Sequence, residues 1–150
     1  MAGTEGQDKR LEAINIQLVN NTEDLNIKYQ VYVQGIGWQD WKQNGEMAGT
    51  EGEDKRLEAI KIELEDTEDY SIMYRVHVQN IGWQDWKTDG EIAGTEGQNK
   101  RLEAIEIKIV EKQKRANLYI DTPYNGDTYY NLETSNITVS GWKMVNMSNS

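Results

Sequence analysis

A repeat with a period of about 45 residues limits the possible folds of this chain more than any other feature. Three copies of a segment of the form AGTEGxxKRLEAI begin at Ala2, Ala48 and Ala93. Between them lie two copies of a tryptophan-rich segment, GIGWQDWK and NIGWQDWK. A unit of this length cannot bury an apolar face alone, so neighbouring units must pack against one another.

The periodicity inside each unit is that of β-strands. Residues 25–34 and 70–79 alternate apolar and polar side chains, and residues 13–18 do the same. Polar turns at 20–24 and 65–69 separate these segments, and no stretch has the pattern of an amphipathic helix. The sequence therefore predicts an all-β repeat domain, and the size of its unit fits a pseudo-three-fold β-prism or β-trefoil, or a propeller blade.

The alignment of the copies predicts the domain organisation. Met1 aligns with Met47 and Ile92, so we expect a half repeat at 1–24 and whole repeats at 25–69 and 70–112. We expect this half repeat to lack the strands that pair with its long strand at 11–18. That strand should therefore present an exposed apolar edge that favours oligomerisation. Residues 113–150 should form a linker and the truncated start of a second β module.

Charge and composition exclude several classes of function. The net charge of −10 argues against nucleic acid or an anionic membrane as a partner, and no apolar run could insert into a membrane. Cysteine is absent and His77 is the single histidine, present in one copy only. We therefore expect no catalytic site, no cofactor and no metal, and hence no enzyme activity. Met1 is not followed by a signal peptide.

The segment VQNIGWQDWKTDGEIAGTEGQNKRLEAIEI closely resembles the clostridial hydrophobic (ChW) repeat, and the likeness covers roughly residues 1–112. The resemblance implies a secreted or cell-surface protein with a role in binding or adhesion. The segment IDTPYNGDTYYNLETSNITVSGW also looks like the start of an Ig-like module, which can accompany such repeats.

A fainter resemblance concerns the strand start GQDKRLEAINI, which is similar to a strand that recurs in jacalin-like β-prism lectins. This resemblance implies a pseudo-three-fold, β-prism-like fold, with the β-trefoil as the alternative. In those lectins an aspartate at this position binds sugar, which implies ligand-binding roles for Glu12, Glu58 and Glu103. The chain departs from the lectin pattern because glutamate replaces aspartate and an arginine replaces the aromatic residue, at Arg10, Arg56 and Arg101. Each Arg and Glu could clamp a polar ligand, or they could pair with one another or with the next unit.

The tryptophans are the other candidate site. Trp38 and Trp41 are an odd number of residues apart, as are Trp83 and Trp86, so in a regular strand one of each pair should enter the core and the other face solvent. A solvent-facing indole can stack on a sugar ring while neighbouring polar groups bind its hydroxyls. Those neighbours are Gln39, Asp40, Gln84 and Asp85. The alternative is that both tryptophans of each pair are structural.

These patterns together favour a non-catalytic extracellular module that binds polysaccharide or cell-wall glycan through repeated sites. The alternative is a protein-interaction or adhesion scaffold whose repeated residues bind neighbouring units or another surface protein.

Overall fold

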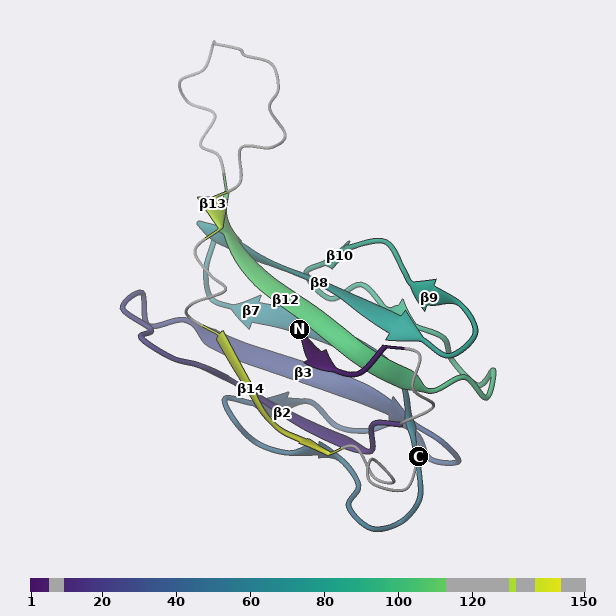
Figure 1. Ribbon diagram of the computed structural model, residues 1–150. Helices are drawn as coiled ribbons and strands as arrows, with labels where there is room; N and C mark the ends of the chain where they lie inside the picture. Colours follow the sequence, from purple (N-terminus) through teal and green to yellow (C-terminus); the bar gives the residue numbers. More distant parts are fainter. Residues whose placement is uncertain (6–9, 113–129, 132–136, 144–150) are drawn as a thin grey trace.

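The computed structural model describes residues 1–5, 10–112, 130–131 and 137–143, and in these parts every regular element is a β-strand (Figure 1). The strands form three antiparallel sheets. Sheet I contains β1 (Ala2–Gly3), β12 (Leu102–Glu111), β8 (Tyr70–Val78), β10 (Lys87–Thr88), β9 (Gly82–Trp83) and β13 (Tyr130–Asn131). Sheet II contains β11 (Ala93–Gly94), β7 (Leu57–Glu65), β3 (Asn26–Val33), β4 (Gly37–Trp38) and β5 (Lys42–Gln43). Sheet III contains β14 (Ile137–Lys143), β2 (Ala13–Leu18) and β6 (Ala48–Gly49).

The alternating pattern of each long strand becomes a dry and a wet face. Along β3, every second residue from Ile27 to Val33 is buried, and the residues between them are partly exposed. The buried side chains of all three sheets join in one hydrophobic cluster, represented by Ile16 in sheet III, Val31 in sheet II and Val76 in sheet I. The predicted all-β repeat fold is therefore confirmed, and three sheets around a shared core correspond to the β-prism rather than the trefoil alternative.

The three units meet at the starts of their long strands. The amide of Leu57 donates to the carbonyl of Leu11 over 2.7 Å, and the amide of Leu11 donates to the carbonyl of Leu102 over 3.3 Å. All three leucines are buried. Residues from equivalent positions are thus bonded to one another around the pseudo-three-fold axis.

The units also interlock through the segment Ala-Gly-Thr-Glu, which we call the tongue and which occupies residues 2–5, 48–51 and 93–96. Each tongue forms a short strand on the long strand of a different unit: β6 pairs with β2, β11 with β7, and β1 with β12. The tongue of the first unit therefore closes the circle by pairing with the third. Only glycine fits the second tongue position, because a Cβ at Gly49 would lie 2.3 Å from the carbonyl oxygen of Glu12.

Two equivalent tyrosines link adjacent sheets. The Tyr29 hydroxyl of sheet II accepts a hydrogen bond from the amide of Ile16 in sheet III and donates to the carbonyl of Glu46. The Tyr74 hydroxyl donates to the carbonyl of Glu91 in the same way. Burial raises the pKa of Tyr29, and it raises the pKa of Tyr74 to about 12, because the charged phenolate is poorly solvated there.

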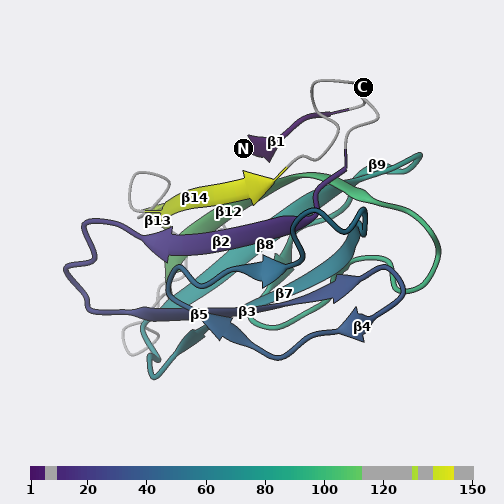
Figure 2. The same ribbon diagram turned by 90° about the horizontal axis from the view of Figure 1, so that it is seen from below.

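The expected exposed edge at residues 11–18 is wrong. Strand β14 pairs with β2, and the two run side by side in sheet III (Figure 2). The register matches Ile137 with Leu18, as Ile27 matches Leu64 in sheet II, so β14 takes the position that β3 has there. Ile14 and Ile16 are consequently buried.

The described strands of the C-terminal segment, β13 and β14, both pair with strands of the repeat sheets. The segment 120–142 that resembles an Ig-like module includes β13 and nearly all of β14, so the described part of it belongs to the repeat sheets and does not support that resemblance. The remainder of 113–150 lies outside the described residues, and the division into two domains stays a prediction. Among the residues described, no helix has the length and apolar character needed to cross a bilayer.

Candidate functional site

The tryptophan hairpins lie on the outer faces of sheets I and II. Strands β4 and β5 have two residues each, and residues 39–41 between them are not in a strand. The alternation rule therefore does not apply across this segment. Trp38, Trp41, Trp83 and Trp86 are all partly exposed, and none of these four side chains belongs to the hydrophobic core. The expectation that one tryptophan of each pair enters the core is therefore wrong.

The first tryptophan of each hairpin is held by a tongue. The indole N–H of Trp38 donates to Glu96 Oε2 over 2.6 Å, and the indole N–H of Trp83 donates to Glu5 Oε2. Both glutamates belong to the next unit around the circle. Each indole also makes an edge-to-face contact with the last outward residue of the adjoining strand, Tyr32 or His77. Trp38 and Trp83 therefore serve as links between units.

Each indole of sheet II lies over a cation of that sheet. Lys61 Nζ of β7 is 4.4 Å from the ring centroid of Trp38. Lys28 Nζ of β3 is 4.8 Å from that of Trp41. Such contacts hold an aromatic ring against a charged surface.

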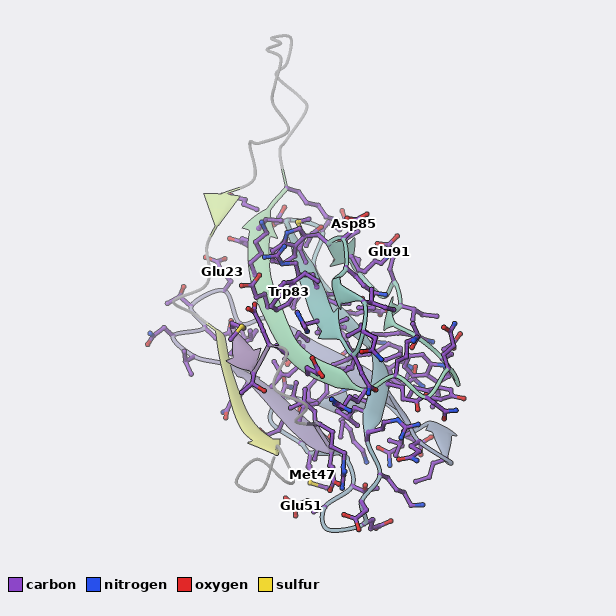
Figure 3. The ribbon with its side chains drawn as sticks, turned by 45° about the vertical axis from the view of Figure 1, so that its right-hand side comes forward. Glu23, Met47, Glu51, Trp83, Asp85 and Glu91 are labelled. Carbon is purple, nitrogen blue, oxygen red and sulfur yellow. The ribbon has the colours of Figure 1, made fainter. Side chains whose placement is uncertain are left out.

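Sheet I repeats this contact with different residues. The guanidinium carbon of Arg75 on β8 is 4.8 Å from the centroid of Trp83 and 5.0 Å from that of Trp86. Lys108 Nζ on β12 is 4.4 Å from the centroid of Trp86. Figure 3 shows Trp83 against the strands of sheet I, with Asp85 farther out, towards the β10 side.

The cation beneath each indole is kept although the strand that supplies it changes. Four cross-strand pairs lie under the hairpins, and each contains one cation: Gln30 with Lys61, Lys28 with Glu63, Arg75 with Glu106, and Met73 with Lys108. Under the second tryptophan of the hairpin, the cation comes from β3 in sheet II and from β12 in sheet I. Under the first tryptophan, the cation comes from β7 in sheet II and from β8 in sheet I. A substitution in one strand is compensated in its partner, which indicates that the cation–indole contact itself is what the fold requires.

The second tryptophan of each hairpin differs from the first. The indole N–H groups of Trp41 and Trp86 have no hydrogen-bond partner within the described residues. The preceding residues, Asp40 and Asp85, are exposed, and neither carboxylate has an ion pair or hydrogen bond in that part of the chain. A partly exposed indole, a free N–H donor and a free carboxylate thus occur together twice.

The amides next to the first tryptophans have folding roles. Gln39 Oε1 accepts from the amide of Gly49 over 2.8 Å, and Gln84 Oε1 accepts from that of Gly94 over the same distance. Both contacts fix a tongue beside its own hairpin. These two predicted site residues are therefore engaged within the fold.

The arginine and glutamate side chains at the strand starts pair with one another. Glu12, Glu58 and Glu103 are at most 3% exposed. Their arginine contacts are Arg10–Glu12 at 2.9 Å, Arg56–Glu58 at 2.9 Å and Arg101–Glu103 at 3.1 Å.

The same groups reach the neighbouring unit. Glu58 Oε1 also accepts from the amide of Gly97, and Arg56 donates to Asn99 over 2.8 Å. This geometry matches the alternative in which the repeated charges join neighbouring units.

Sheet III offers no equivalent site in the part that the structure describes. The positions that carry the charged pairs in the other sheets are Thr138 with Gln17 and Ser140 with Asn15. Across the described ranges, no group of three or more acidic or histidine side chains is placed to hold a metal ion.

Sequence reasoning missed the four cations, Lys28, Lys61, Arg75 and Lys108. The signal that could have found them is the exchange of charge between the two copies, which becomes visible once the strands are paired in register.

Comparison with known proteins places the chain in a family. A family model described as clostridial hydrophobic W (ChW) matches residues 1–20, 32–66 and 77–111, which together make up more than half of the chain. No curated protein and no solved structure matches it. Each of the two longer matched segments runs from a tryptophan hairpin through a tongue to a long strand. The chain belongs to the ChW repeat family.

Proposed function

We propose that this chain is a non-catalytic, extracellular module that binds polysaccharide or cell-wall glycan through Trp41 and Trp86. The observation that carries the proposal is that the indole N–H of each residue has no partner in the described part of the chain, while the preceding residue, Asp40 or Asp85, has an exposed carboxylate. A sugar ring presents C–H groups to an aromatic face and hydroxyl groups to polar atoms at the edge of that face. Both kinds of partner are present at each position.

The cations support this assignment. Lys28 and Lys108 belong to the sheet, so each contacts the indole face that is turned towards the sheet. The opposite face is then left for a ligand. Because the ring is already oriented, little conformational entropy is lost when a sugar stacks on it.

The described hairpins give two such sites, on different sheets of one particle. A polymer that reaches both would bind more tightly than its single sugars, because the second contact forms at a high effective concentration. This bivalency fits a surface module that attaches to an extended glycan. Membership of the ChW family supports placing the module on a cell surface or in a secreted protein. The net charge of −10 argues against nucleic acid as its partner, and the sequence has no apolar run long enough to insert into a membrane.

A specific observation favours a second candidate, a protein-interaction or adhesion scaffold. Trp38 and Trp83 bind glutamates of neighbouring units, and the Arg56–Glu58 pair contacts the amide of Gly97 and the side chain of Asn99 in the next unit. In such a scaffold the tryptophans would serve assembly alone, and no sugar would bind.

The test is a titration of the chain with soluble plant and bacterial wall polysaccharides, followed by calorimetry. The double variant Trp41→Ala/Trp86→Ala should lose binding and keep the unfolding midpoint of the parent within a few degrees. The matched control is Trp38→Phe/Trp83→Phe, which removes the bonds to the tongues and should lower the midpoint while sugar binding persists in the folded protein. Absence of binding across the panel would reject the glycan module and favour the scaffold.

A further inference from the structure

The contact between a tongue and a long strand occurs three times with the same chemistry. The aligned pairs are Ala2 with Ile105, Ala48 with Ile14 and Ala93 with Ile60. In each case the threonine amide of the tongue donates to the carbonyl of the buried glutamate on the strand, over 2.8 to 2.9 Å. Any tongue of this sequence therefore matches any of the three strands.

The contact selects its peptide at two positions. A Cβ on Gly3 would lie 2.2 Å from the carbonyl oxygen of Glu103, so any larger residue is excluded there. The carboxylate of Glu5 accepts the indole N–H of Trp83, a charge-assisted bond that rewards an acidic residue. Together these features define a site for the peptide Ala-Gly-Thr-Glu.

The tongue at residues 2–5 is less deeply seated than the other two. Ala48 and Ala93 are fully buried, whereas Ala2 is only partly buried. The contact that closes the circle on sheet I is therefore the one most open to exchange.

The contact is head-to-tail, because one unit supplies the tongue and a different unit supplies the strand. Interfaces of this kind close into a ring when the last partner returns to the first, and they join separate molecules when it does not. Within this chain the tongue is tethered through the few residues that precede Leu11, which gives an effective concentration on the order of millimolar. A tongue from another molecule should then bind once the tethered one is displaced.

We propose that the surface formed by β12, Glu103 and Trp83 is a peptide-binding site for the Ala-Gly-Thr-Glu tongue, and that a second copy of this chain supplies the tongue in trans. Exchange of tongues would link modules into strings without any new interface. The proposal is independent of sugar binding, since it uses Trp83 and leaves Trp41 and Trp86 free.

The test uses the full chain with Gly3→Ala, which prevents its own tongue from docking and alters no residue of the site. The probe is a synthetic peptide with the sequence of residues 2–7, and the readout is the indole N–H resonance of Trp83 in a ¹⁵N-labelled sample. We expect a saturable shift of this resonance. A control peptide with alanine at the glycine position should bind at least about tenfold more weakly, as should one with glutamine for glutamate.

A second variant keeps the test valid if Gly3→Ala alters the fold. Glu5→Gln retains the strand pairing of β1 and weakens only the bond to Trp83, so the peptide should compete with the tethered tongue and restore the Trp83 resonance. A mixture of labelled Gly3→Ala chain with unlabelled wild-type chain should give the same shift at high concentration. A Trp83 resonance that does not respond, or that responds equally to the control peptides, would overturn the proposal.

Discussion

Replacement of Gly49 by alanine should destabilise the fold strongly, because the tongue is where the units interlock. Gly49 has a φ of 105°, and its Cβ would lie 2.3 Å from Glu12 O and 2.8 Å from Ala13 Cα. Both of these are backbone atoms of fully buried residues at the start of β2, so neither can move aside. The pairing of β6 with β2 should therefore open.

The loss of unfolding free energy in Gly49→Ala is the sum of backbone strain and broken hydrogen bonds. A positive φ costs an alanine about 1–2 kcal/mol. Opening the pairing breaks the bond from the Thr50 amide to Glu12 O, at 2.9 Å, together with ladder bonds, each of which contributes about 1 kcal/mol. The total is about 3–5 kcal/mol, a large part of the stability of a domain of this size.

The matched control is Gly52→Ala, three residues further along the chain, in the bend that follows β6. Gly52 has a φ of 72° and no atom within 4 Å of its Cβ position. This control should cost only the backbone term of about 1–2 kcal/mol. Urea unfolding followed by tryptophan fluorescence gives the midpoint and the m value for both. Equal losses for the two variants would refute the role assigned to the tongue contact.

Three further predictions follow from buried polar groups and from the indole contacts. Glu58→Ala removes the ion pair with Arg56 and the acceptor of the Gly97 amide at a site that is 2% exposed, and it should cost about 3–5 kcal/mol in urea unfolding. Glu53→Ala, at an exposed position, should stay within about 0.5 kcal/mol, and similar values for the two would contradict the structural role of the pair. Because burial raises the pKa of Tyr74 to about 12 from its ordinary 10, the folded state keeps its proton where the unfolded state has lost it, so stability present below pH 10 is lost as the pH rises towards 12. Relative to Tyr74→Phe, the wild type should lose about 1.4 kcal/mol per pH unit in that window, and a constant difference between the two would argue against the shift. Lys61→Gln should free the Trp38 ring and change its fluorescence while Lys55→Gln, a control on a lysine without an indole contact, should not; no difference between the two variants would count against the cation–indole contact.

The strand faces could be predicted from the sequence because alternation reports burial directly. Ile27, Tyr29, Val31 and Val33 follow the expected pattern residue by residue. The repeat likewise indicated that units must share a core, since each has one apolar face and no means of covering it alone.

The placement of the tryptophans could not be predicted from spacing. The rule of alternate faces needs a continuous strand, and the hairpin leaves the strand at Gln39 and re-enters it at Lys42. The strand that pairs with β2 could not be predicted from the sequence either, because β14 lies far along the chain and has only a short alternating pattern. Non-local pairings of this kind are decided by tertiary packing.

The candidate site was predicted in part. Asp40 with Trp41, and Asp85 with Trp86, were among the proposed ligand contacts, and their side chains remain available. The buried glutamates were also proposed as ligand contacts, but a buried carboxylate that is paired with an arginine is poorly accessible to a ligand. Burial and pairing are three-dimensional properties, which explains why the sequence could not separate the two groups.

The central claim, that Trp41 and Trp86 bind glycan while Trp38 and Trp83 join the units, can be tested in one spectrum. The chain has 5 tryptophans, so a sample labelled with ¹⁵N at the indole shows few and well-separated signals. On titration with a polysaccharide that binds, the resonances of Trp41 and Trp86 should shift together, and those of Trp38 and Trp83 should stay in place. Shifts at Trp38 and Trp83, or no shift at Trp41 and Trp86 with any polysaccharide of the panel, would contradict the account.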